Sequence, residues 1–149
     1  DTDAGRLINK VSRGRAKKGD TAGSVSLNGY IAVKVCGVDT YVHRIIWQMA
    51  TGSPPPDQID HINGDRADNR LCNLRPANNS ENNSNREIQN NNTSGYKGVS
   101  LHKKSGLWFA YAAKNGIRFS GGYHADKKSA GESAARLRER LHGDFCNHG

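Results

Sequence analysis

The sequence predicts an α+β fold built from several small packed units rather than around one large core. Only 34% of the 149 residues are hydrophobic, against about 45–50% in typical globular domains. Two separate stretches show the period-two alternation of strands, and each is followed by a pattern of helical spacing. Small antiparallel sheets, each accompanied by a short helix, account for these observations.

The first of these stretches predicts a hairpin and a helix. Residues 25–42 alternate as strands around a turn at 37–39, and residues 43–51 place apolar side chains at helical spacing. Gly52 and the three prolines at 54–56 end that helix, because proline cannot continue it.

A second hairpin with a long polar loop is predicted next. Residues 59–62 and 71–75 have the pattern of short strands, and the loop 63–70 lies between them. Asparagine and serine, which dominate the following segment, favour helix caps and turns. We therefore expect one short helix near Ser80–Glu87 and then a loose linker to about Ser94.

The last third of the chain predicts a three-stranded sheet backed by one helix. The pair Asn115-Gly116 is a strong hairpin signal, and Asp126 is the expected cap of the helix. Strands are expected at 96–101, 107–112 and 117–121. The apolar stripe of the helix consists of Ala130, Ala134, Leu137 and Leu141.

Positive charge is concentrated at the two ends of the chain. The formal net charge is +8 and the pI is about 9.6. Residues 1–50 carry 8 Lys or Arg and 4 Asp or Glu, residues 51–92 carry 4 and 6, and residues 93–149 carry 10 and 4. This balance favours a polyanionic partner such as nucleic acid, although a basic protein need not bind one. The basic segment 1–24 suits either a phosphate-binding arm or a solvated, mobile stretch.

Three scattered cysteines, Cys36, Cys72 and Cys146, form no CxxC pair. Structural zinc is therefore not expected, and neither is a disulfide scaffold. No apolar run reaches the roughly 18 residues of a membrane span, and no signal-peptide pattern opens the chain. We expect a cytoplasmic protein that has no membrane partner.

Two neighbouring residues, Asp60 and His61, together with two downstream asparagines suit phosphodiester hydrolysis. Asn73 and Asn82 lie 12 and 21 residues after His61. Carboxylate and amide oxygens are hard donors that hold Mg²⁺ while leaving positions for water and phosphate oxygens. Such an ion can neutralise charge on the leaving 3′-oxygen, and a neutral imidazole can take a proton from the attacking water.

Five short motifs surround these residues. They are Val42-His43-Arg44, Ile59-Asp60-His61-Ile62-Asn63-Gly64-Asp65, Asp68-Asn69-Arg70, Asn73-Leu74-Arg75 and Glu81-Asn82. Together they resemble the HNH endonucleases, and more narrowly the phage and intron homing endonucleases of the ββα-metal fold. The resemblance covers about residues 25–86.

The resemblance implies a role for each residue of this set. Asp60 and Asn82 would bind the metal, with Mg²⁺ expected and Mn²⁺ as the alternative. His61 would be the general base, and Asn73 would hold the hairpin. Asn82 stands where other family members often have a third catalytic-motif His, a variant that many homing members share.

His43 and Arg44, at the start of the first predicted helix, are expected to contribute to phosphate or DNA binding. An arginine can clamp the scissile phosphate through paired hydrogen bonds. The alternative for His43 is a supporting position behind the site or a cap at the start of the helix.

The C-terminal segment resembles a known DNA-binding module. Gly95-Tyr96-Lys97-Gly98-Val99, then Trp108-Phe109-Ala110-Tyr111, then a helix rich in Ala and Arg resemble the DNA-binding domain of plant ethylene-response factors over about residues 94–143. In that family the sheet lies in the major groove. The resemblance implies that the residues facing DNA are Lys97, Lys103, Trp108, Tyr111, Lys114 and Arg118. In the alternative, Trp108 and Phe109 are core residues and the lysines form a solvated face.

These observations predict three segments: a basic N-terminal segment 1–24, an HNH nuclease domain 25–92, and a DNA-binding module 93–149. We expect a monomeric homing-type endonuclease from a phage or mobile element, which cuts double-stranded DNA to leave 5′-phosphate and 3′-hydroxyl ends. One alternative is a DNA-binding protein with an inactive nuclease fold. Another is a non-specific nuclease.

Overall fold

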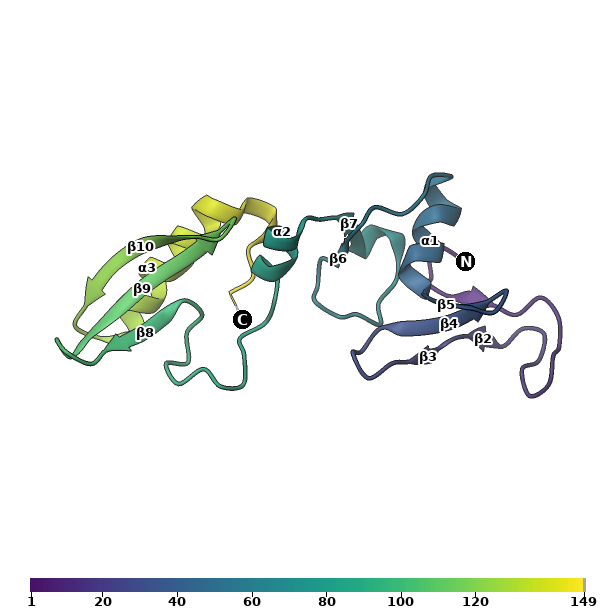
Figure 1. The fold of residues 1–149 in the computed structure, drawn as a ribbon, viewed down its shortest axis with the longest axis horizontal. Coiled ribbons are helices and arrows are strands. Elements are labelled where there is room, and N and C mark those ends of the chain that lie inside the picture. The colour runs from purple at the N-terminus through teal and green to yellow at the C-terminus, as the bar shows by residue number, and fades with distance from the viewer. Residues whose placement is uncertain (149) are drawn as a thin grey trace. The chain divides into compact units, whose positions relative to one another are not determined.

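The computed structural model describes residues 1–148, and its contacts divide the chain into two compact units. The first unit is Asp1–Ala77, and the second begins at Asn78. Each unit combines short antiparallel strands with helices, so the predicted α+β class is confirmed (Figure 1). In the described part of the chain, no helix has both the length and the apolar character needed to cross a membrane.

The first unit begins with two small antiparallel ladders. The basic residues of segment 13–18 are exposed in the connection between the first two strands, while Leu7 packs against the core of the unit. The segment expected to be an arm or a mobile stretch is therefore anchored to the rest of the unit. The strands are β1 (Leu7–Ile8) with β2 (Thr21–Ala22), and β3 (Ser24–Val25), β4 (Ile31–Val35) and β5 (Val38–Tyr41) in the order β3-β4-β5.

The turn between β4 and β5 is shorter than predicted. Val35 pairs directly with Val38, so only Cys36 and Gly37 connect the strands. Both have positive φ, 50° and 84°, as the twist-matched two-residue hairpin turn requires. The predicted turn at 37–39 was wrong because cysteine is not a residue that signals this backbone conformation.

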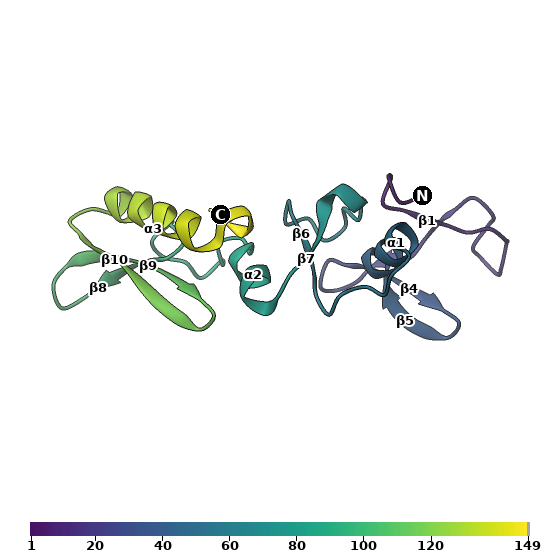
Figure 2. The same ribbon diagram turned by 90° about the horizontal axis from the view of Figure 1, so that it is seen from above.

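Helix α1 (Val42–Thr51) covers one face of the β3-β4-β5 sheet (Figures 1 and 2). It matches the predicted helix and ends at Gly52, which adopts the left-handed conformation at φ 69°. Its inner side buries Val42 and Ile46 completely. The core cluster of the unit is Val42, Ile46, Ile59 and Leu74, with Leu7, Ile31, Val33 and Trp47 packed around it.

A second hairpin completes the first unit. β6 (Ile59–His61) pairs with β7 (Leu74–Pro76), so that Asp60 lies opposite Arg75. Residues Leu71–Asn73 form a 3₁₀ turn rather than the start of the strand predicted at 71–75. The backbone N–H of Asn73 donates to the carbonyl of Arg70 at 2.9 Å, and this turn shortens the strand.

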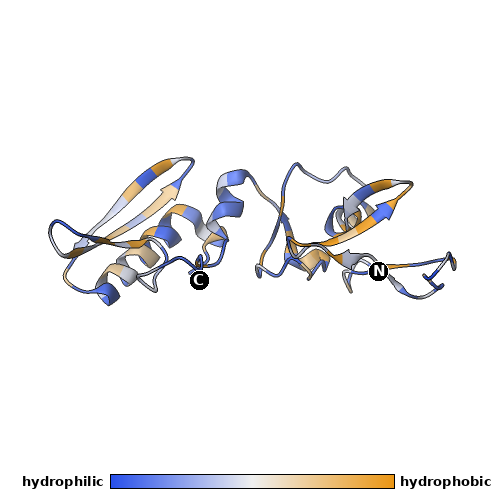
Figure 3. Cartoon of the chain, turned by 60° about the horizontal axis from the view of Figure 1, so that its bottom comes forward, coloured by the Kyte–Doolittle hydropathy of each residue, from blue (hydrophilic) through white to orange (hydrophobic). Residues whose placement is uncertain are grey.

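The second unit opens with α2 (Asn79–Ser84), which is hydrophilic throughout (Figure 3). Asn78 and Glu81 form a reciprocal capping box at its start. The helix ends three residues before the predicted position, since Asn85 is its C-terminal cap. The contacts group α2 with the second unit, whereas the resemblance assigned residues 25–92 to the nuclease domain.

The rest of the second unit is a three-stranded sheet with one helix packed on it, as predicted. Asn115 and Gly116 both have positive φ in the turn between the last two strands, and Asp126 caps the helix through the N–H of Ser129. The core consists of Val99, Ala110, Ala130 and Ala134. The elements are β8 (Val99–His102), β9 (Leu107–Lys114), β10 (Ile117–His124), α3 (Lys127–His142) and the 3₁₀ turn Gly143–Phe145, with strand order β10-β9-β8.

Candidate active site

Strand β6 buries two adjacent ionisable residues. Asp60 is 4% exposed and His61 is 3% exposed. Asp60 Oδ2 accepts a hydrogen bond from Arg75 Nε at 2.8 Å and lies 2.7 Å from Arg75 Nη2. The guanidinium therefore compensates the buried carboxylate across the β6–β7 ladder and fixes the orientation of Asp60.

The imidazole of His61 is held by Asn69, a residue to which the sequence analysis gave no role. Nε2 of His61 lies 3.1 Å from Oδ1 of Asn69, and Asn69 is 1% exposed. The other atom of that amide, Nδ2, donates to the carbonyl of Ala67 at 3.3 Å. Because an amide oxygen only accepts, Nε2 carries the proton, and the neutral ring has its lone pair on Nδ1. The only signal in the sequence was the place of Asn69 within the motif Asp68-Asn69-Arg70.

Asn73 closes the loop that follows His61. Its Oδ1 accepts from the backbone N–H of Asn63 at 3.0 Å, and its Nδ2 donates to Asn63 Oδ1 at 3.0 Å and to the Asp68 carbonyl at 2.8 Å. Its own carbonyl accepts from Ile62 N–H at 2.9 Å. One buried side chain thus joins both ends and the middle of the loop.

A surface ion pair supports the same loop. Arg70 donates to the two carboxylate oxygens of Asp68 from Nε at 2.8 Å and from Nη2 at 2.7 Å. These bonds lower the pKa of Asp68 to about 2, so its carboxylate is ionised at neutral pH. Asn63 also donates to Asp68 Oδ2, at 2.9 Å.

His43 lies buried behind His61, where the ring of a supporting residue would be. The two imidazole centroids are 5.2 Å apart and meet edge to face, and Tyr41 stacks on His43 at 5.6 Å. Tyr30 contacts both imidazoles, at 5.3 and 5.8 Å. His43 is 5% exposed, so it is not on the surface where direct phosphate binding was expected.

Arg44 is also engaged within the protein. Its Nη1 donates to the carbonyls of Pro56 at 3.1 Å and Asp57 at 3.3 Å. These bonds tie α1 to the segment that leads into β6. In this conformation the guanidinium supports the approach to the site.

Asn82 lies in α2, where its backbone N–H donates to the carbonyl of Asn78 at 3.0 Å. The contacts group α2 with the second unit and Asp60 with the first. The pairing of Asp60 with Asn82 on one metal ion therefore stays a prediction. Among residues 1–148, no cluster of three or more His, Cys, Asp or Glu side chains is present.

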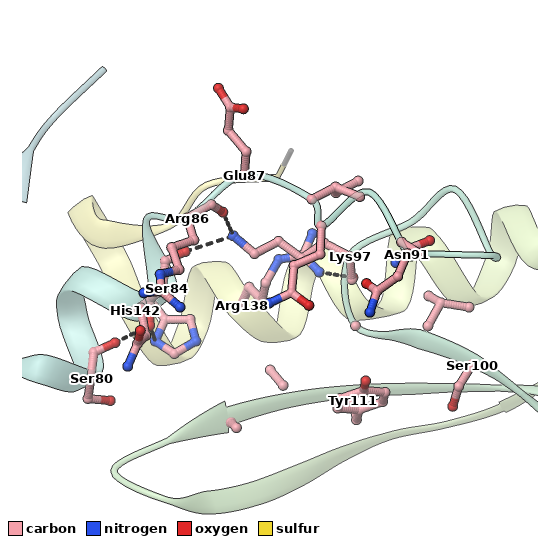
Figure 4. Close-up of a pocket in the computed structure, with 18 of the residues that line it drawn as sticks. Ser80, Ser84, Arg86, Glu87, Asn91, Lys97, Ser100, Tyr111, Arg138 and His142 are labelled. Atoms are coloured by element: carbon pink, nitrogen blue, oxygen red, sulfur yellow. Dashed lines mark hydrogen bonds between the residues drawn. The ribbon is translucent and has the colours of Figure 1, made fainter. Parts of the chain in front are cut away.

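The expected DNA-contacting residues of the second unit divide into two groups. Lys103, Tyr111 and Lys97 line a groove of about 1390 Å³ beside the segment 78–93 (Figure 4). The ammonium of Lys97, however, donates to the carbonyls of Ser84 at 2.8 Å, Asn147 at 2.9 Å and Arg86. Burial, followed by the nearby charge of Arg138, lowers the pKa of Lys97 to about 8.

The expectation that Lys97 and Trp108 share the outer face with Tyr111 was wrong. Trp108 packs against the core cluster under α3, because residues three apart on a strand point to opposite faces. Lys97 is held by backbone carbonyls. Lys114 donates to the carbonyl of Leu141 at the end of α3, whereas Arg118 lies over the Tyr111 ring at 4.5 Å.

Comparison with known proteins places this site in a nuclease domain. Residues 40–84 match the model of the HNH endonuclease family, a range that contains Asp60, His61, Asn73 and Asn82. The chain is also 34% identical over 108 residues to Protein 3.8 of Escherichia phage T7, which covers 70% of this chain and 86% of that protein. The chain therefore belongs to the same family as that phage protein and carries an HNH endonuclease domain. No solved structure matches it.

The buried His43 predicts a measurable pH dependence of stability. Desolvation, followed by the neighbouring His61 and Arg44, lowers the pKa of His43 from 6.5 to about 4. The unfolded chain binds a proton at this residue below pH 6.5, while the folded chain does not until about pH 4. Stability from this residue is therefore complete above pH 6.5 and falls as the pH drops towards 4, by about 3 kcal/mol in total.

Urea unfolding at pH 7 and pH 5 tests this prediction. Between these values the wild type should lose about 2 kcal/mol more free energy of unfolding than His43→Gln, which has no titrating ring. An equal pH dependence in both proteins would show that His43 is not held in its neutral form.

Proposed function

We propose that this protein is a metal-dependent DNA endonuclease of the homing type, which hydrolyses phosphodiester bonds to leave 5′-phosphate and 3′-hydroxyl ends. The observation that supports this most strongly is the arrangement on β6. His61 is buried directly after Asp60, and its Nε2–H is bonded to Asn69. This arrangement suits a general base with a defined tautomer beside a metal-binding carboxylate.

In this proposal His61 is the general base. With the proton on Nε2, the lone pair of Nδ1 accepts a proton from the attacking water. Asn69 holds the ring in this tautomer, and Asn73 keeps the loop that carries Asn69 closed. These two asparagines are positioning residues, because they act through His61.

The donor chemistry fits a hard divalent cation. Asp60 supplies a carboxylate and Asn82 an amide oxygen, the ligand types that suit Mg²⁺, with Mn²⁺ as the alternative. When bound, such an ion stabilises the negative charge that develops on the leaving 3′-oxygen. Arg75 holds Asp60 Oδ2 at 2.8 Å and so orients the carboxylate for this role.

The proposed substrate is double-stranded DNA. The net charge of +8 favours a polyanion, and the basic C-terminal unit, with Arg118 and Lys103 exposed, would add recognition to cleavage. A separate recognition unit favours a site-preferring enzyme over a non-specific one. A monomer with a single site would nick one strand, and a relative from a phage suggests action inside a host cell.

Conversion of supercoiled plasmid to nicked circles tests the proposed activity. The wild type should nick DNA in Mg²⁺ and stop on addition of EDTA, since the charge on the leaving oxygen is then not neutralised. End-labelling should find 5′-phosphates at the nicks. Tight DNA binding without cutting under any divalent cation would instead support the alternative of an inactive nuclease fold.

Two substitutions at Asn69 test its positioning role. Asn69→Ala removes the partner of Nε2 and should slow nicking on the order of tenfold to hundredfold. Asn69→Asp keeps an acceptor but adds a negative charge, which should raise the pKa of His61. The acid limb of the rate profile should then move to higher pH. A slower enzyme with an unshifted pH profile in Asn69→Asp would indicate only a structural role.

A further inference from the structure

The sheet of the second unit has one face under α3 and a second face that carries aromatic rings. Val99 and Ala110 point towards α3 and are buried in its core, so their immediate neighbours on each strand point the other way. Register places Ser100 opposite Phe109, and Phe109 opposite Tyr123, on this second face. Figure 2 shows α3 along one side of the sheet only.

The rings on this face form a continuous array across all three strands. His102 and Tyr123 have centroids 5.3 Å apart, Tyr123 and Phe109 are 4.8 Å apart, and Phe109 and Tyr111 are 5.9 Å apart and nearly parallel. Tyr123 is 54% exposed, and His102 is also exposed. A soluble domain gains nothing in its own stability by leaving such a connected ring surface in water.

The charge around the array is entirely positive. Residues 97–125, which contain the three strands, hold five Lys or Arg and no Asp or Glu. Arg118 lies over Tyr111 at 4.5 Å, and within residues 1–148 no carboxylate forms an ion pair with it. Lys103 and Lys104 are exposed in the β8–β9 turn. This surface is complementary to a polyanion that also presents flat, stackable groups.

We infer that this aromatic face binds an unpaired segment of DNA, with bases stacked on His102, Tyr123, Phe109 and Tyr111 and phosphates near Arg118 and the β8–β9 turn. The choice of DNA over other polyanions rests on the proposed nuclease function. The module would thus engage a locally opened strand or a single-stranded end.

The composition of the face favours unpaired over paired bases. A duplex hides the flat faces of its bases and shows only their edges, which proteins read through hydrogen-bonding side chains. Phe109, at the centre of the array, has no hydrogen-bonding atom, and Arg118 is the only arginine of the three strands. Exposed rings on a sheet are instead suited to stack with bases that are free of partners.

Fluorescence anisotropy of the full chain in EDTA tests this inference without cleavage. The probe is a labelled strand of about 20 nucleotides, longer than the roughly 4–16 nucleotides that one such module covers, used alone or annealed to its complement. The variants are Phe109→Leu and Tyr123→Leu. Phe119→Leu is the matched control, since Phe119 pairs with the buried Ala112 and so lies on the face towards α3.

The wild type should bind the single strand more tightly than the duplex. Phe109→Leu and Tyr123→Leu should each weaken single-strand binding by about fivefold to a hundredfold, the loss expected for one stacked base, while Phe119→Leu changes it by less than about twofold. Tyr123 is largely exposed, so its variant keeps the test valid if Phe109→Leu unfolds, which circular dichroism reports.

A preference for duplex, or equal affinities in all three variants, would overturn the inference. The plasmid assay separates this from the nuclease proposal. Cutting that persists while both ring variants bind the single strand normally removes only the inference about stacking. Ring-dependent binding of the single strand by a protein that cuts no DNA removes only the nuclease proposal.

Discussion

The hydrogen bonds of the Asn73 side chain hold the loop between β6 and β7 in one conformation, and the geometry around His61 depends on that loop. The amide bonds to Asn63 at the start of the loop and to Asp68 near its end. Asn69 follows Asp68 directly, so its contact with His61 requires the same closure. Hydrogen bonds to a single amide therefore connect the polar loop to the tautomer of a buried imidazole.

Polar residues make up an unusual share of the interior of the first unit. Five polar side chains are buried there, against four hydrophobic ones in its core cluster. An unpaired buried polar group costs roughly 1–3 kcal/mol, so the pairs Asp60–Arg75 and His61–Asn69 are each needed to keep their partners satisfied. His43 Nδ1 has no hydrogen-bond partner among the described residues, and its ring remains neutral because burial lowers its pKa. Stability and a site with two neutral imidazoles thus depend on the same interior.

Local patterns in the sequence predicted most of the elements, and contacts between distant segments account for what they missed. Period-two alternation identified β9, but the resemblance placed Trp108 and Tyr111 on one surface although strand geometry puts them on opposite faces. The partners of Lys97 include the carbonyl of Asn147, 50 residues away, which no local pattern encodes. The motif spacing identified Asp60 and His61, whereas the role of Asn69 became visible only once the loop conformation was known.

The most direct test of this account is the single-turnover rate of plasmid nicking by His61→Ala in Mg²⁺, with His148→Ala as a control that removes an exposed histidine. If His61 is the general base that Asn69 and Asn73 position, its loss lowers the rate by about 10²- to 10⁴-fold while His148→Ala keeps the wild-type rate. Equal rates in the wild type and a folded His61→Ala would contradict the account.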